Sequence, residues 1–236
     1  MIISHTHKFI FIKSFKTAGT SVEAELSNIC SGCDIVTPMN DYRHNRDENG
    51  VFIHKSMNAE EFIRLDLPNI QHADALTIKS QVTPEVWNDY FKFSITRNPW
   101  DRAVSYFYWE NRLNPALNPT KKFYHYLGIP FKELEQLKRL FSDYIKQATW
   151  PNNDCFYILD DQPCTDFVIQ YERLSEDYSK VCKKLGLTAS MLPRLKGSVR
   201  KQRYHYSDYY DEETIAIVAK RHKNDIRFFD YTFERR

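Results

Sequence analysis

The stretch that decides the fold spans residues 9–21 and reads Phe9-Ile10-Phe11-Ile12-Lys13-Ser14-Phe15-Lys16-Thr17-Ala18-Gly19-Thr20-Ser21. Its first four residues form an apolar run that is too short for a buried helix, so they predict a central strand. The polar turn that follows contains one glycine, and residues 22–26 have helical composition, with the helix ending before Gly32. The order of strand, polar turn and helix is typical of the ligand-binding edge of an open α/β sheet.

The rest of the chain continues this alternation. Aromatic and β-branched residues predict further strands over 90–97 and 165–171. Helices are predicted from Asn98-Pro99 to about residue 112, over 131–148, from the third strand to Gly186, and over 211–223. We expect a three-layer α/β fold with a central, mainly parallel sheet flanked by helices, and aromatic residues 228–233 packed on that sheet. No repeat or linker interrupts the pattern, so residues 1–236 are predicted to form a single domain.

Composition excludes several classes of protein. The 236 residues are 42% hydrophobic and 27% charged, as in an ordinary folded domain, and the formal net charge of +2 argues against a nucleic-acid partner. No apolar run approaches the roughly 18–20 residues of a membrane span, and the first residues lack the pattern of a signal peptide. We therefore expect a cytoplasmic protein. The five cysteines include one close pair, Cys30 and Cys33, but no second pair at zinc-ligand spacing, so no metal site is expected. Their odd number favours reduced thiols.

The turn at residues 16–21 has the chemistry of a phosphate cradle. Gly19 lets the backbone approach a ligand, Lys16 brings a positive charge, and the helix start offers free N–H groups. Hydroxyl groups come from Thr17, Thr20 and Ser21. The segment is not a Walker A loop, because the lysine precedes the glycine. The alternative is an ordinary helix N-cap.

A second cluster of this kind follows the next strand. Arg97 lies at the strand end, at the same predicted sheet edge as the first turn, and Ser105 lies two turns into the helix. A guanidinium and a hydroxyl suit a phosphate group. The alternative is that Asp101 and Arg102 merely solvate the helix.

Together the two segments resemble a known family. Residues 16–21 are similar to the 5′-phosphosulfate loop of sulfotransferases that use 3′-phosphoadenosine 5′-phosphosulfate, and residues 97–105 resemble their 3′-phosphate motif. The resemblance extends from about residue 9 to residue 233 and points to the carbohydrate-type branch. The family often has proline before the loop lysine and glycine near the end, where this chain has Phe15 and Asp230. Further matching segments are His72-Ala73, 167–172, Leu192-Pro193 and 225–233.

The resemblance implies a P-loop NTPase-like fold and transfer of a sulfuryl group from that donor to an acceptor hydroxyl or amine. A carbohydrate or glycolipid acceptor is favoured, and a small metabolite stays open. The implied catalytic residues are Lys16 and His72, and no metal is implied. The implied donor-binding residues are Lys16, Thr17, Ala18, Gly19, Thr20, Ser21, Arg97, Ser105 and Arg200.

Two other functions stay open on the sequence alone. One is a kinase-like enzyme that binds a nucleotide. The other is a non-catalytic module that binds an anionic glycan through the basic segment 194–205. The acceptor site is expected in segments 34–57 and 112–130.

Overall fold

The computed structural model describes residues 1–38, 70–111, 134–193, 195 and 204–236. The chain divides into two compact units, each made of two stretches of sequence. The α/β unit comprises residues 1–96 and 153–195, and the helical unit comprises residues 97–152 and 196–236. The expectation of a single domain stays a prediction.

The α/β unit is built on a five-stranded mixed sheet with the order β3-β1-β2-β4-β7. Strands β2, β4 and β7 are parallel, whereas β1 is antiparallel to β2 and to β3. The parallel register places Ile12 beside Ser94 and Thr96 beside Gln170, so these strands end at one edge. The prediction of a mainly parallel sheet is confirmed. The strands are β1 (Ile2–Ser4), β2 (Phe9–Ile12), β3 (Ile35–Val36), β4 (Phe91–Thr96) and β7 (Phe167–Gln170).

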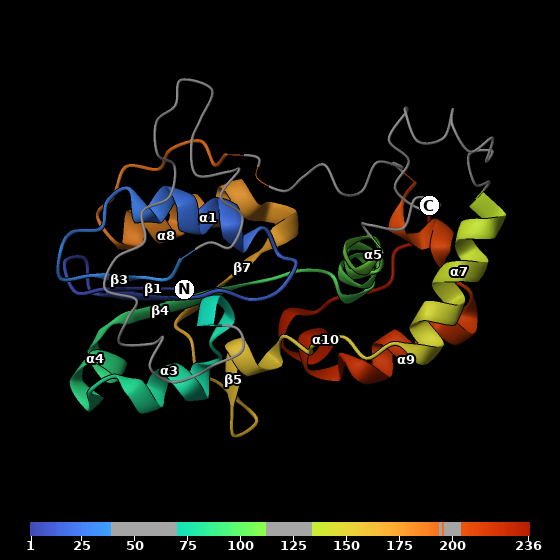
Figure 1. Ribbon diagram of the computed structural model, residues 1–236, viewed down its shortest axis with the longest axis horizontal. Coiled ribbons are helices and arrows are strands. Elements are labelled where there is room, and N and C mark those ends of the chain that lie inside the picture. The colour runs from blue at the N-terminus through green and yellow to red at the C-terminus, as the bar shows by residue number, and fades with distance from the viewer. Residues whose placement is uncertain (39–69, 112–133, 194, 196–203) are drawn as a thin grey trace. The chain divides into compact units, whose positions relative to one another are not determined.

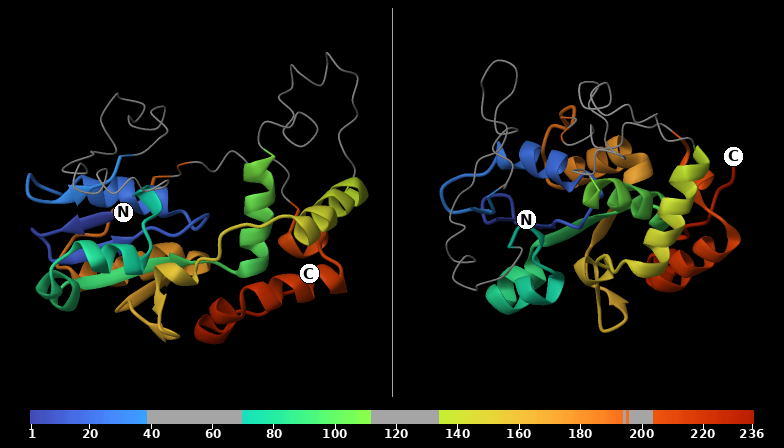
Figure 2. Two further views of the ribbon diagram at one scale, coloured as in Figure 1. Left: turned by 60° about the horizontal axis from the view of Figure 1, so that its bottom comes forward. Right: turned by 45° about the vertical axis from the view of Figure 1, so that its right-hand side comes forward.

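Helices flank both faces of this sheet. Helices α1 (Gly19–Ser27) and α8 (Leu174–Lys184) cover one face, and α3 (Ala75–Gln81) and α4 (Pro84–Asp89) lie on the other (Figures 1 and 2). All four residues of β2 are buried, as expected for a strand covered on both faces. The α/β arrangement is therefore confirmed. The smaller elements are η2 (Ile70–His72), η3 (Asp154–Phe156), η4 (Tyr171–Arg173) and a hairpin of β5 (Ile158–Leu159) and β6 (Gln162–Pro163).

The helical unit contains α5 (Pro99–Glu110), α7 (Leu134–Gln147), η5 (Tyr206–Tyr209), α9 (Glu212–Arg221) and α10 (Lys223–Phe229). Helix α5 begins as predicted, because the Asn98 side chain accepts from the first free N–H groups and Pro99 takes the first helical position. Among the described residues, none of the helices has the length and apolar character needed to cross a membrane.

Two details near the C-terminus bear on the sequence analysis. The Phe233 ring lies edge-on to Trp100 and Tyr210, at 5.6 and 5.3 Å between ring centroids. The prediction that the aromatic tail packs on the sheet is therefore wrong for Phe233, which packs within the helical unit. Asp230 caps α10 at a φ of 55°. Asp is one of the few residues besides Gly that adopts this left-handed conformation at small cost, so the departure from the family's glycine preserves the helix end.

Candidate active site

The turn after β2 is fixed to the neighbouring strand. The Ser14 hydroxyl donates to the Ile95 carbonyl of β4 and bonds the Thr17 hydroxyl at 2.7 Å. Because β2 and β4 are parallel, the turn lies at the carboxyl edge of the sheet. The Thr17 hydroxyl is thus bonded within the turn. The backbone N–H of Thr17, and not its hydroxyl, is therefore the group that can bind a ligand.

The backbone of the turn forms a concave group of donors. Lys16 and Ala18 are left-handed, with φ of 60° and 65°, whereas Thr17 between them is not. Such alternation turns successive N–H groups toward one side, as in known anion-binding nests. In the part of the chain that the structure describes, no acceptor bonds the N–H groups of residues 17–20, and Ala18 caps α1 without a side-chain bond. The residues present therefore fit a phosphate-like anion, which the dipole of α1 also favours.

A buried cluster of three charged groups lies next to the turn and includes Lys13, which precedes it in the sequence. The Lys13 amine and the Met1 amine both contact the Glu23 carboxylate, and all three groups are buried. Burial raises the pKa of Glu23, but the two positive charges outweigh burial and lower it to about 2. Glu23 is therefore a charged structural group. Lys16, in contrast, is only half-buried.

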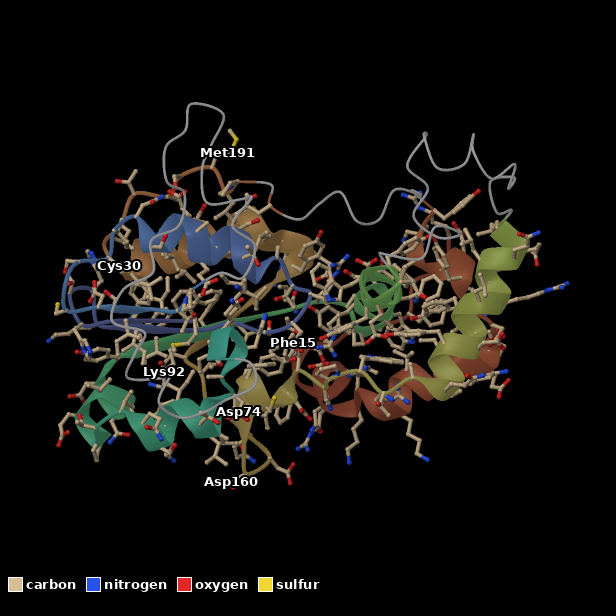
Figure 3. All side chains as sticks on the ribbon, in the orientation of Figure 1. Phe15, Cys30, Asp74, Lys92, Asp160 and Met191 are labelled. Carbon is tan, nitrogen blue, oxygen red and sulfur yellow. The ribbon has the colours of Figure 1, made fainter. Side chains whose placement is uncertain are left out.

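His72 lies against the same turn. Its Nδ1 donates to the Lys13 carbonyl at 2.8 Å, because a carbonyl only accepts. The proton on Nδ1 leaves the lone pair on Nε2, for which the described residues provide no partner. Burial, followed by the Lys13 charge, lowers the pKa of His72 to about 3, so the imidazole is neutral near pH 7. The ring stacks on Phe15 with centroids 4.1 Å apart, and Phe15 is labelled in Figure 3 close to η2.

The second predicted cluster belongs to the helical unit. Arg97 directly follows the last residue of β4, and its Nε and Nη2 donate to Oδ2 of Asp101 at 2.9 and 2.6 Å. Ser105 is half-buried on α5. Arg102 does not solvate the helix, because it is buried and donates to Asp225 at 3.1 Å. That alternative is wrong for Arg102.

The remaining predicted residues are only partly covered by the structure. Thr20 is half-buried, and the Ser21 hydroxyl accepts from the Leu195 N–H at 3.3 Å, so the chain passes the turn at Leu195. Arg200 lies outside the described residues, as do the other basic residues of 194–205 and segments 39–57 and 112–130. Within the described ranges, no group of three or more His, Cys, Asp or Glu side chains is arranged to hold a metal ion.

Sequence reasoning missed three residues that shape the site. Lys13 and Ser14 follow the apolar run directly, and that position was a signal that they lie at the sheet edge. Asn153 bonds both backbone groups of Phe15 across 138 residues, and no local pattern announces it.

Comparisons with known proteins identify the family of the chain. A protein of Archaeoglobus fulgidus named only as an uncharacterized protein is 28% identical over 122 residues, which cover 51% of this chain and 88% of that protein. No solved structure matches the chain. The sequence model described as "Sulfotransferase family" matches residues 1–232, and the chain therefore belongs to the sulfotransferase family.

Proposed function

We propose that the protein transfers a sulfuryl group from 3′-phosphoadenosine 5′-phosphosulfate to an acceptor hydroxyl. The observation that carries this proposal is the turn that contains Lys16 and leads into α1. The described residues provide no acceptor for the backbone N–H groups of residues 17–20 in this turn. This arrangement suits a tetrahedral anion held by its oxygens. Family membership supplies the sulfuryl chemistry.

The turn has two tasks in this proposal. The N–H groups of residues 17–20 hold the 5′-phosphate end of the donor. Ser21, the next residue, belongs to the same binding segment. When bound, the donor supplies an activated sulfuryl group on its phosphate. Lys16 neutralises the negative charge that develops on the bridging oxygen as that group leaves. Positioning and charge stabilisation are the main sources of rate in such in-line transfers.

Recognition of the 3′-phosphate is assigned to other residues. Arg97 and Ser105 bind it, and Arg200 adds a further positive charge. The contact between Arg97 and Asp101 supports this assignment, because a carboxylate bonded to Nε and Nη2 fixes the plane of the guanidinium. A 3′-phosphate distinguishes this donor from ATP.

His72 is the general base in this proposal. Its Nε2 carries the lone pair, so the imidazole is in the form that accepts the acceptor's proton. A pKa of about 3 keeps it neutral before the donor binds. The negative charges of a bound donor near Lys16 raise that pKa, since opposite charges favour the imidazolium. Glu23 fits the base role poorly, because it is buried and already paired with two amines.

The acceptor is proposed from the resemblance to the carbohydrate-type branch. A hydroxyl of a carbohydrate or glycolipid is therefore the first class to test, followed by small metabolites. A cytoplasmic location stays a prediction.

Thermal unfolding with nucleotides tests the donor first. A ligand at 100 times its Kd adds about 2.7 kcal/mol to the free energy of unfolding. We expect 3′-phosphoadenosine 5′-phosphate to raise Tm, and AMP and ATP to have little effect. Stabilisation by ATP alone favours a kinase-like enzyme, and no response to any nucleotide contradicts the proposal. Transfer of radiolabel from the sulfuryl donor to a panel of carbohydrates then identifies the acceptor.

A further inference from the structure

Asn153 makes an unusual two-point contact with the start of the turn. Its Oδ1 accepts from the Phe15 N–H at 3.3 Å, and its Nδ2 donates to the Phe15 carbonyl at 2.8 Å. Asn153 is fully buried. It stands at the N-cap of η3 but makes no side-chain cap bond there, although capping is the usual task of asparagine in that place. Its amide therefore serves the turn instead of its own helix.

The bonded carbonyl belongs to the peptide that joins Phe15 to Lys16. Fixing that peptide plane restricts the backbone angles on both sides of it. Lys16 has a φ of 60°, a conformation that costs a side-chain-bearing residue free energy and persists only where the surroundings enforce it. The contact with Asn153 lies at Phe15, immediately before Lys16, where it can hold the backbone of Lys16 in the left-handed conformation.

Phe15 is held on a second side as well. Its ring stacks on His72 with an interplanar angle of 20°, and it meets Phe156 edge-on at 5.4 Å. Phe156 is buried and follows Asn153 within η3. The backbone and the ring of Phe15 are thus both fixed by the segment 153–156 and by His72. A proline at position 15 would have no N–H to give to Asn153.

We propose that Asn153 is a positioning residue that holds Lys16 in its left-handed conformation through the backbone of Phe15. Asn153 touches neither donor nor acceptor in this assignment. It acts by fixing the backbone from which the Lys16 side chain extends. The assignment of a rate effect rests on the proposed sulfuryl transfer, whereas the contact itself is testable without it.

The first experiment measures kcat and KM of Asn153→Ala with a radiolabelled sulfuryl donor and the best acceptor of the panel. We expect kcat to fall about 10–100-fold, since small misplacement of a catalytic group has effects of this size, with the KM for the acceptor unchanged. Asn152→Ala is the matched control. It removes an amide one residue away that bonds Arg221 in the helical unit, and we expect its kcat to stay within about two-fold of wild type.

A double-mutant cycle separates positioning from general structure. If Asn153 acts through Lys16, Asn153→Ala has no further effect on kcat when Lys16 is already alanine. Losses that multiply in the double variant overturn the proposal, and so does a wild-type kcat in a folded Asn153→Ala protein.

Hydrogen exchange of the Phe15 amide provides the readout that is independent of activity. Nuclear magnetic resonance should show this amide at least about ten-fold less protected in Asn153→Ala, with the β2 amides unchanged. Should that variant not fold, Asn153→Asp replaces it: the ionised carboxylate still accepts from the Phe15 N–H but has no proton to donate to the carbonyl, so protection persists while kcat falls. Unchanged exchange in folded Asn153→Ala overturns the proposal. A wild-type protein that transfers no sulfuryl group refutes the proposed function instead.

Discussion

Gly19 and Lys13 are packed so closely that a Cβ atom at position 19 would lie 2.9 Å from Cγ of Lys13. The Lys13 side chain has little freedom to retreat, because it is buried and its amine contacts Glu23. The position of Gly19, the first residue of α1, is therefore constrained by the buried ion pair of Lys13 and Glu23. A side chain at position 19 must disturb either the start of α1 or this pair.

This coupling predicts a cost for Gly19→Ala. We expect the free energy of unfolding to fall by about 1–3 kcal/mol, the usual size of overpacking in a filled interior. Gly32→Ala is the matched control, since a Cβ there meets no atom within 4 Å. Urea denaturation of the two variants checks the prediction. Equal stability of both variants would show that Lys13 can move aside freely.

Lys16→Ala should abolish most turnover and spare the fold. Removing one preorganised charge-stabilising donor typically lowers kcat by about 10²–10³. Lys16 is only half-buried, so Tm should change little. Lys183→Ala on the exposed side of α8 controls for loss of a positive charge. Full activity of Lys16→Ala would remove Lys16 from the mechanism.

Arg97→Ala and Ser105→Ala should weaken recognition of the 3′-phosphate specifically. Loss of a hydrogen bond to a charged group is worth about 1.5–3 kcal/mol, so the Kd of 3′-phosphoadenosine 5′-phosphate should rise about 10–100-fold for Arg97→Ala. The Kd of AMP should not change. Calorimetric titration measures both, with Arg139→Ala on the exposed face of α7 as control. A parallel rise for the two nucleotides would argue against a 3′-phosphate site.

Glu23→Gln should destabilise the α/β unit strongly. It leaves the buried amines of Lys13 and Met1 without their negative partner, and breaking a buried ion pair on one side typically costs about 3–5 kcal/mol. The double variant Lys13→Met, Glu23→Gln should recover part of this loss, because it removes one unpaired charge. Chemical denaturation of the three proteins gives the values. A single variant as stable as wild type would mean that the pair is not formed.

Two histidines with lowered pKa values, His72 and His222, predict how stability depends on pH. Burial, aided by neighbouring positive charges, lowers the pKa of His72 to about 3 and that of His222 to about 2. In the unfolded chain both imidazoles bind a proton as the pH falls through about 6.5, whereas in the folded chain they stay neutral there. Stability is therefore complete above about pH 6.5 and falls as the pH drops toward 3.

The free energy of unfolding should be measured between pH 5 and 6.5, above the range in which carboxylates titrate. His222→Gln should reduce the slope of the free energy of unfolding against pH, because about one proton fewer is taken up on unfolding than in wild type. An unchanged slope would mean that the His222 imidazole is protonated in the folded protein.

Much of the fold was readable because its signals are local. Strand β2 is an apolar run, and β4 and β7 are rich in aromatic and β-branched residues. Helix α5 begins with an asparagine cap and a proline that act within three residues. Strand β1 was missed, because three residues carry no period and form a strand only through pairing with β2 and β3. Helix α4 was missed too, since six residues give little periodicity.

The candidate site divides in the same way. The lysine, glycine and hydroxyl residues of the turn predict an anion site, because their residue types and their order in the sequence are typical of one. Which lysine is buried could not be read, since Lys13 and Lys16 both follow the strand and only the contact with Glu23 distinguishes them. The role of Asn153 depends on a bond across 138 residues, which only the folded chain reveals.

The division of the chain into two discontinuous units has a consequence for proteolysis. The polypeptide passes from one unit to the other three times, at Thr96-Arg97, Asn152-Asn153 and Leu195-Lys196. A single cleavage at any one of these junctions leaves both units joined by the other two, so it cannot release a fragment that corresponds to either unit. Simple truncation has the same limit: any stretch long enough to contain the whole sheet also contains residues 97–152 of the helical unit. Circular permutation or coexpressed fragments would be needed to obtain either unit by itself.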